Sequence, residues 1–293
     1  MTMPATVTMS EYRTSPNCGC CGSFCVEFGA AIVLGDVPVR YFRCPRCGLI
    51  TTEEPTWLEK AYSSPIASMD VGILGRCTYL AGLTDAVVRT LPGSKYLDWA
   101  GGYGILTRLL RDRGLDFWHH DPFAPNLFAQ GWEGDPADRW DVITLYEVME
   151  HLHDPFAALS QLARSAPVLL FTTQLLPTPP PRLGSWWYYA LETGQHISFY
   201  TPTALSALAR RLDMQFMTNG ENFHAMHRQG TLSLGASVMI RRPVLSRVIG
   251  PILRRVRPRP SLSEHDFQVA RTSATRAGTD SITDDGRSVG DET

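Results

Sequence analysis

The segment 96–104 of this 293-residue chain reads YLDWAGGYG and decides the predicted fold. A short apolar run ends at Asp98, three glycines follow within residues 101–104, and apolar residues then recur at helical spacing over 105–113. A buried strand, a sharp glycine turn and a helix account for this order. Because glycines carry no side chain, such a turn lets a ligand lie close to the backbone.

The residues that follow alternate between strand and helix patterns. Apolar runs predict strands over 117–120, 141–146 and 168–172, and the spacing of residues 203–212 predicts a helix. Residues 232–240 are predicted to be the strand that closes the sheet. This alternation predicts an α/β fold in which helices cover both faces of a mostly parallel sheet.

The composition is that of a folded protein without a membrane span. Hydrophobic residues make up 44% of the chain and charged residues 19%. No apolar run approaches the roughly 20 residues of a spanning helix, and no signal-like stretch opens the chain, so we expect a cytoplasmic protein. Residues 1–240 hold 17 basic and 22 acidic residues. This acidic balance disfavours a nucleic-acid partner, which needs a basic face.

A second acidic residue lies at a spacing that suits a nucleoside. Asp121 follows the strand predicted at 117–120, where its carboxylate could accept hydrogen bonds from both ribose hydroxyls. The dinucleotide pattern Gly-x-Gly-x-x-Gly is absent, because Thr107 occupies the third position. Asp98 would repel a pyrophosphate but suits the ammonium group of an amino-acid ligand.

Together these motifs resemble those of class I S-adenosylmethionine-dependent methyltransferases. Residues 96–104 resemble the first motif of that family, and HDP at 120–122 resembles its ribose-binding acid. Residues 140–152, WDVITLYEVMEHL, are similar to its fourth strand and the Glu-His that follows. The resemblance covers roughly residues 95–240 and implies a Rossmann-like sheet flanked by helices that binds S-adenosylmethionine.

The resemblance implies six cofactor-binding positions, of which the last lies at the end of the fourth strand: Asp98, Ala100, Gly102, Gly104, Asp121 and Tyr146. Ala100 stands where the family usually has its first glycine. A sulfonium is already a strong electrophile, so the protein must mainly align the nucleophile and exclude water. No metal is required at the reacting centre.

Six of the seven cysteines fall within residues 17–50. Two Cys-x-x-Cys-Gly knuckles, CGCCG at 18–22 and CPRCG at 44–48, predict one tetrahedral site of four thiolates: Cys18, Cys21, Cys44 and Cys47. Four thiolates leave no open position, so we expect structural Zn²⁺ in a small N-terminal zinc-ribbon-like module. Cys20, Cys25 and Cys77 are not expected to be ligands.

Three histidines are candidates for proton transfer in catalysis. His196 lies in an aromatic-rich segment where class I methyltransferases form the substrate wall, and its imidazole could take the proton from a hydroxyl. A purely hydrogen-bonding role for His196 stays open. His151, which follows Glu150, is interpreted first as a brace for its helix and second as a catalytic group, and His227 is the third candidate.

The function expected from these motifs is methylation of a small molecule, with O-methylation of a sugar or glycan hydroxyl ahead of other reactions. The cysteines and QHISF at 195–199 resemble, more loosely, zinc-containing C-methyltransferases that act on nucleotide-linked keto sugars. Carbon methylation is therefore one alternative. An RNA methyltransferase that grips its substrate with the zinc module, and a noncatalytic cofactor-binding partner protein, are the others.

The expected organisation has four parts, with boundaries at changes of composition: a zinc-binding module at 17–55, a helical linker at 56–94, the methyltransferase domain at 95–242 and an Arg-rich segment and tail at 243–293. Apolar residues recur every four positions among the arginines of 243–259, so peripheral membrane contact is possible there, although a packed terminal helix is favoured. Residues from about Ser263 onward are expected to be disordered.

Overall fold

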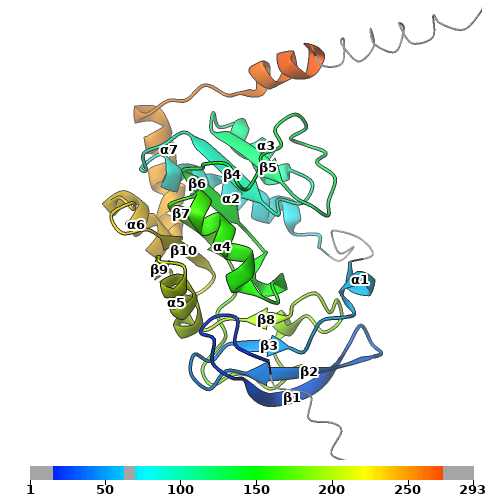
Figure 1. Cartoon of the computed structure of the whole chain (residues 1–293). Helices are drawn as coiled ribbons and strands as arrows, with labels where there is room; N and C mark the ends of the chain where they lie inside the picture. Colours follow the sequence, from blue (N-terminus) through cyan, green and yellow to red (C-terminus); the bar gives the residue numbers. More distant parts are fainter. Residues whose placement is uncertain (1–15, 63–69, 273–293) are drawn as a thin grey trace, which may run out of the picture.

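The computed structural model describes residues 16–62 and 70–272, which form two β-sheets and the helices around them (Figure 1). The larger sheet has six strands in the order β5-β4-β6-β7-β10-β9, and the smaller has four in the order β1-β2-β3-β8. No helix within the described residues is long and apolar enough to cross a membrane.

The larger sheet is mostly parallel, as predicted. Its strands are β4 (Lys95–Trp99), β5 (Asp116–His120), β6 (Val142–Leu145), β7 (Val168–Thr172), β9 (Gln215–Thr218) and β10 (Phe223–His227). The first four run parallel, and β10 is antiparallel to both of its neighbours. Every residue of β6 and β7 is buried, because helices cover both faces of the sheet.

Alternate residues of the central strands enter two separate cores, as the two-residue period of a strand requires. Ile143 and Leu169 pack in the core beneath α4 and α5, whereas Val142 and Leu170 pack in the core beneath α2, α3 and α6. The bounds of these helices are α2 (Ile73–Val88), α3 (Ile105–Arg111), α4 (Pro155–Ser165), α5 (Pro202–Arg211) and α6 (Leu234–Arg241). The predicted α/β fold, a Rossmann-like sheet flanked by helices, is confirmed.

One predicted strand is wrong. Residues 232–240, expected to close the sheet, instead lie largely in α6, whose N-terminus is capped by Ser233. Ala236, Met239 and Ile240 are buried while Leu234 is exposed, which is a helical spacing and not a two-residue alternation. The closing strands are β9 and β10, and β10 was not recognised because its sequence, FHAMH, places two histidines at buried positions.

The cysteine-rich part of the chain forms the smaller sheet, which lies at one end of the molecule (Figure 1). Its strands are β1 (Val26–Val33), β2 (Val37–Arg43), β3 (Ile50–Thr52) and β8 (Ser198–Phe199). β8 comes from a part of the chain more than 140 residues after β3, with Ile50 opposite Phe199 and Thr51 opposite Ser198. The short helix α1 (Leu58–Ala61) follows β3.

The Arg-rich segment packs against α2. It forms α7 (Ser246–Val256), and Arg254 pairs with the buried Asp85 of α2 at 3.1 Å. Residues 263–272 are helical, contrary to the expected disorder, because the buried Asp266 accepts two hydrogen bonds of 2.7 Å from Arg111. The rest of the expected disordered tail, 273–293, lies outside the described residues.

Candidate functional site

The topology of the larger sheet creates a switch point between β4 and β6. The chain leaves β4 through α3 to β5 on one side, and the strand on the other side of β4 is β6. In open α/β sheets, ligands bind at the carboxyl ends of the strands where the strand order reverses in this way. The glycine turn follows β4 directly, so it lies at this edge.

The glycine turn has a backbone that side chains would disfavour. Gly102 and Gly104 have φ values of +59° and +84°, and Ala100, which replaces the usual glycine, has +56°. A Cβ on Gly101 would lie 2.5 Å from a carboxylate oxygen of Asp98, whereas a Cβ on Gly102 would meet nothing within 4 Å. The backbone at Gly102 therefore faces open space that a ligand could fill.

Asp98 lies beneath this turn and is only 2% exposed. Its carboxylate accepts hydrogen bonds from Thr144 at 2.7 Å and Thr107 at 3.2 Å, which join β4 to β6 and α3. Burial raises the pKa of Asp98 to about 7, and the Asp121 carboxylate adds to the increase. The side chain thus supports the turn from below, so any effect on a ligand's ammonium group would act through the turn or through water.

Asp121 ties the end of β5 to the glycine turn. One carboxylate oxygen accepts from the Gly102 N–H at 2.8 Å, and the other accepts from the N–H groups of Phe123 and Ala124, also at 2.8 Å. Tyr146, at the end of β6, exchanges a 2.7 Å hydrogen bond with Thr84 of α2. The structure therefore brings Asp98, Asp121 and the glycines together, while the hydroxyl of Tyr146 contacts α2.

The chain turns sharply after β6. Glu147 has a φ of +56°, a conformation that a non-glycine residue adopts at a cost of about 1–3 kcal/mol. Thr172 holds it there, accepting from its N–H at 2.7 Å and donating to its carboxylate at 2.8 Å. Arg76 lies 3.6 Å from the other carboxylate oxygen. The turn leads directly into the short helix η1 (Met149–His151).

Glu150, His151 and His196 form a cluster that lies beyond this turn. One ligand atom from each residue lies within 4.8 Å of the others, and the two imidazole rings are 5.0 Å apart between centroids. Glu150 and His151 belong to η1, whereas His196 comes from the segment just before β8. The cluster therefore joins two of the three predicted histidines with a carboxylate that the sequence analysis left without a role.

Backbone carbonyls orient both imidazoles of the cluster. Nδ1 of His196 lies 2.7 Å from the carbonyl oxygen of Tyr188, and Nδ1 of His151 lies 2.9 Å from that of Gln195. A carbonyl can only accept, so Nδ1 of His196 carries the proton and its Nε2 keeps its lone pair. Nδ1 of His151 also lies 2.8 Å from the Tyr62 hydroxyl, which can donate or accept, so two tautomers of His151 are compatible with its contacts. Burial lowers the pKa of both histidines, which favours their neutral forms.

Glu150 is fully buried, and neither of its carboxylate oxygens has a well-formed hydrogen bond within the described part of the chain. Burial raises the pKa of Glu150 to about 7, with a further increase from Glu147 and smaller opposing effects of His196 and the Tyr188 hydroxyl. Buried carboxylates are ordinarily paired or hydrogen-bonded, because desolvation of an ion is costly. The placement of Glu150 is thus a mark of a functional site.

His227 does not join this cluster. It lies on β10 opposite Val168, the first residue of β7, and so belongs to the other edge of the sheet. Its Nδ1 is 3.0 Å from the carbonyl oxygen of Arg228. His224, on the same strand, bonds Thr173 and Thr218, and burial lowers its pKa to about 4, so it is a neutral core residue.

The four predicted cysteine ligands meet at one point. Their sulfur atoms all lie within 4.8 Å of one another, with Cys18 and Cys47 3.4 Å apart and Cys21 and Cys44 also 3.4 Å apart. Four converging thiols with little exposure are the donor set of a closed zinc site, so these residues fit the group. Cys20, Cys25 and Cys77 are not members of this group.

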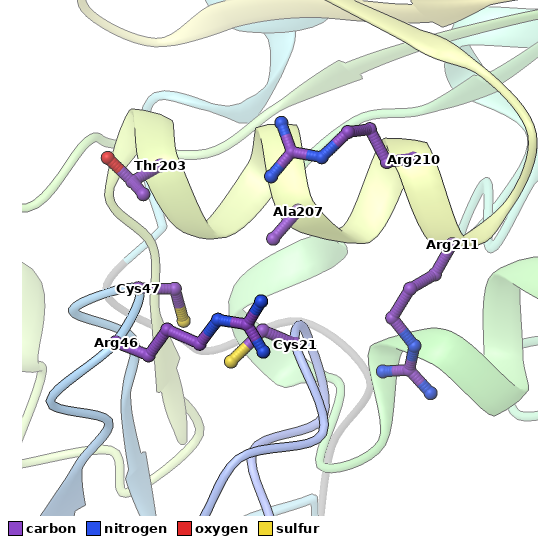
Figure 2. A pocket seen from close by; sticks show the side chains of 7 residues that line it. All are labelled: Cys21, Arg46, Cys47, Thr203, Ala207, Arg210 and Arg211. Atoms are coloured by element: carbon purple, nitrogen blue, oxygen red, sulfur yellow. The ribbon is translucent and has the colours of Figure 1, made fainter.

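A pocket of about 250 Å³ lies beside these cysteines and is shown in Figure 2. Cys21 and Cys47 form part of its wall together with Arg46 from the second knuckle, and α5 contributes the other lining residues, Thr203, Ala207, Arg210 and Arg211. Four thiolates around a divalent ion carry a net charge of about −2. The guanidinium groups would offset that charge, which gives this pocket a structural explanation.

Comparison with protein families identifies one match, and it covers much of the larger sheet. Residues 76–217 match the sequence model of a family described as a methyltransferase domain. The matched segment begins within α2 and includes the glycine turn, Asp121 and the Glu150, His151 and His196 cluster. No curated protein matches the chain.

Three of the solved structures that match this chain have low sequence identity to it. The magnesium protoporphyrin IX methyltransferase of Synechocystis PCC 6803 with bound SAM is 14% identical, with 59% of this chain and 89% of that one covered and a TM-score of 0.39. Human N-acetylserotonin methyltransferase in complex with SAM is 15% identical, with 59% and 65% covered and a TM-score of 0.41. An O-methyltransferase family protein from Burkholderia thailandensis is 13% identical, with 59% and 67% covered and a TM-score of 0.41. Residues 76–217 are therefore similar in sequence to a methyltransferase domain, and they form much of the Rossmann-like α/β sheet.

Proposed function

We propose that the protein transfers a methyl group from S-adenosylmethionine to a hydroxyl of a small molecule, with a sugar or glycan as the first candidate. The observation that carries this proposal is the open backbone at Gly102, tied to the Asp121 carboxylate at the switch point of the sheet. A nucleoside fits there, because the turn offers an uncovered backbone and the acid offers hydrogen-bond acceptors for ribose hydroxyls. The methyltransferase-domain match includes both residues.

Each proposed cofactor residue has its own task. Gly102 and Gly104 leave room for the ligand, and Ala100 sets the direction of the turn through its left-handed conformation. Asp121 accepts one N–H on the oxygen that faces Gly102, so that oxygen retains a lone pair for a ribose hydroxyl. Asp98 and Tyr146 position the ends of β4 and β6 through their threonine partners.

The Glu150, His151 and His196 cluster is the proposed site of the acceptor hydroxyl. It follows β6 at the carboxyl edge of the sheet, the same edge as the glycine turn. S-adenosylmethionine, when bound, supplies the methyl group that passes from its sulfonium to the acceptor oxygen. His196 offers a free Nε2 lone pair, so the cluster can hold the hydroxyl and draw off its proton as the oxygen becomes an ether.

A sugar ranks first among acceptors because of the aromatic segment before His196. Most of its rings pack in the core beneath the smaller sheet, and Tyr188 and Tyr189 are buried there. Trp187 is 74% exposed and offers a flat apolar face, and its ring contacts that of Tyr188, in the same segment as His196. Such a face suits the apolar side of a ring substrate.

We also propose structural zinc at Cys18, Cys21, Cys44 and Cys47. The cysteines share their core with Met149 and Leu159 of the larger unit, and β8 completes the sheet that follows them. We therefore propose that the 17–55 module folds onto residues 95–242 as one unit and orients the segment that carries His196. The helix α2, within the expected linker 56–94, packs on α3, α6 and α7.

The test of this function is calorimetry with S-adenosylmethionine on zinc-loaded protein, followed by mass spectrometry of candidate sugars. We expect saturable cofactor binding in the wild type and its loss in Asp121→Ala. A hydroxyl-bearing acceptor should gain the mass of one methylene. Arg164→Ala, which changes a side chain of α4 outside the proposed cofactor site, is the matched control and should bind normally. Absence of saturable binding in the wild type would disprove the proposal.

A further inference from the structure

We propose that Glu150, His151 and His196 bind a divalent transition-metal ion, at a second metal site separate from the four cysteines. The inference rests on the proposed function, because it specifies what the cluster holds when the acceptor hydroxyl arrives. It begins from the grouping itself: a carboxylate oxygen and two imidazole nitrogens lie within 4.8 Å of one another. That spacing requires only small side-chain movements to place all three around one ion.

The imidazoles are already prepared as ligands. Metal-bound histidines almost always donate their other ring N–H to a carbonyl or carboxylate, which fixes the ring and raises the basicity of the metal-binding nitrogen. His196 has this arrangement, with its Nδ1 held by the carbonyl of Tyr188, so its Nε2 lone pair is available. His151 has it in the tautomer whose Nδ1–H donates to the Gln195 carbonyl, and metal binding at Nε2 would select that tautomer.

The carboxylate provides the second, independent observation. Glu150 is 0% exposed, and both of its oxygens lack a well-formed hydrogen bond within residues 16–62 and 70–272. Two imidazoles and a buried carboxyl group without a well-formed hydrogen bond in those residues form a site in which a divalent cation would supply the compensating charge.

The donor set determines the kind of ion. Two imidazole nitrogens and a carboxylate oxygen suit first-row ions such as Mn²⁺, Fe²⁺, Co²⁺ and Zn²⁺, unlike the all-sulfur cysteine site. Three protein ligands leave open coordination positions, where a hydroxyl or a pair of adjacent sugar hydroxyls can bind. A coordinated hydroxyl loses its proton to water more readily. With the ion bound, Nε2 of His196 would be a ligand, and water would receive the proton that the proposed function otherwise assigns to His196.

The fold also explains why the three ligands are held together. The backbone of Ile197, next to His196, donates its N–H to the Glu150 carbonyl at 2.8 Å and accepts from the Thr52 N–H at 3.0 Å. One peptide segment thus connects η1 to the end of β3. The cysteine-bearing sheet therefore fixes the distance between His196 and the two ligands of η1.

The experiment is a Mn²⁺ titration of the full-length, zinc-loaded protein, followed by electron paramagnetic resonance. Mn²⁺ prefers nitrogen and oxygen donors, so it leaves the thiolate site to zinc. We expect one saturable Mn²⁺ site whose electron spin echo modulation shows ¹⁴N coupling from histidine. Bound Mn²⁺ without nitrogen coupling, or no saturable binding, would overturn the inference.

Variants locate the site. Glu150→Gln keeps the shape of the side chain and removes its charge, and it should weaken Mn²⁺ binding at least about tenfold, as should His196→Ala. The matched control is His153→Ala, which removes a nearby partly exposed histidine outside the cluster and should bind Mn²⁺ like the wild type. Equal Mn²⁺ affinity in Glu150→Gln, His196→Ala and the wild type would overturn the inference.

Calorimetry with S-adenosylmethionine on the same preparations separates the two proposals. Saturable cofactor binding together with absent Mn²⁺ binding overturns the metal site and leaves the proposed function standing. Saturable Mn²⁺ binding with ¹⁴N coupling supports the metal site, even where cofactor binding fails and the proposed function is overturned. Circular dichroism on each variant confirms that the compared proteins are folded.

Discussion

The cysteine cluster and the Glu150, His151 and His196 cluster both bring potential metal ligands together, but they differ in the number and the origin of their donor atoms. The cysteines come from two local knuckles and supply four identical donors, so the proposed zinc site is closed. The second cluster draws on η1 and on a segment more than 40 residues later, and its three donors leave one side open. A site with four protein ligands and no open coordination position suits a structural role, whereas a site with three ligands leaves room for a reactant to bind.

The two clusters are connected through the smaller sheet. β3 follows the second knuckle and pairs with β8, which begins two residues after His196. Ile197 links both to Glu150 through its backbone. The cysteine region is thus joined by backbone hydrogen bonds to the segment that carries His196, and through this segment it would affect the proposed acceptor site without contacting the substrate.

The largest expected effect comes from breaking the closed cluster. Cys44→Ser should abolish the zinc-dependent structure of the smaller sheet and with it activity, because structural zinc contributes on the order of 10 kcal/mol to such modules. Thermal unfolding followed by circular dichroism, with zinc content by mass spectrometry, measures the loss. Cys77→Ser, outside the cluster, is the control and should retain its zinc. A stable Cys44→Ser protein with full activity would refute this role.

The next effect comes from the open cluster. His196→Ala should lower methyl transfer by about 100-fold or more while cofactor affinity changes little, because the residue lies in the proposed acceptor site and not in the glycine turn. Turnover with a labelled methyl donor measures the rate, and calorimetry measures the affinity. His227→Ala, at the opposite edge of the sheet, should change turnover only a few-fold. Unchanged turnover in His196→Ala would remove it from the mechanism.

Asp98 is a buried acid that has hydrogen-bond partners, unlike the buried Glu150, and we expect it to make stability depend on pH. The pKa of Asp98 is raised to about 7 by burial, above its unfolded value, so the protonated form is the one that folding favours. Its contribution to stability is fully present below the unfolded pKa near 4 and is lost as the pH rises to about 7. The slope of the unfolding free energy there is at most about 1.4 kcal/mol per pH unit.

Asp98→Asn should remove this contribution to the slope. Urea unfolding of the wild type and of Asp98→Asn between about pH 4 and 7 measures the difference between their slopes. Thr144 and Thr107 bond different carboxylate oxygens, so in the variant one hydroxyl can donate to the amide oxygen and the other can accept from the amide NH₂, which keeps part of the network. Parallel stability curves for the two proteins would contradict the assignment.

The smallest expected change in stability comes from a hydrogen bond that helps to connect the two clusters. Ser198 in β8 donates a 2.7 Å hydrogen bond to the carbonyl of Leu152, just after η1. Ser198→Ala should cost about 1 kcal/mol of stability, because it removes the donor from this partly buried hydrogen bond. Ser185→Ala, at an exposed serine, should change stability by less than about 0.5 kcal/mol. Equal stability of the two variants would show that this link is unimportant.

The sequence was most informative where the pattern is local. The β4 strand, the glycine turn and the start of α3 follow from a contiguous run, and the four cysteines follow from the spacing of two knuckles. It misled at residues 232–240, where apolar content was mistaken for a strand, and over 263–272, where few hydrophobic residues suggested disorder. A buried ion pair between Asp266 and Arg111 orders that segment, and composition does not reveal such a pair.

The α/β class, the glycine turn with its acids and the convergence of four cysteines were predictable from the sequence, because each depends on periodicity or short spacing. The pairing of β8 with the cysteine-bearing sheet and the meeting of His196 with Glu150 and His151 became visible in the folded chain. So did the position of His227 at the far edge. The physical reason is that chain crossings and strand pairing bring distant segments together, and burial then sets which polar groups keep a partner.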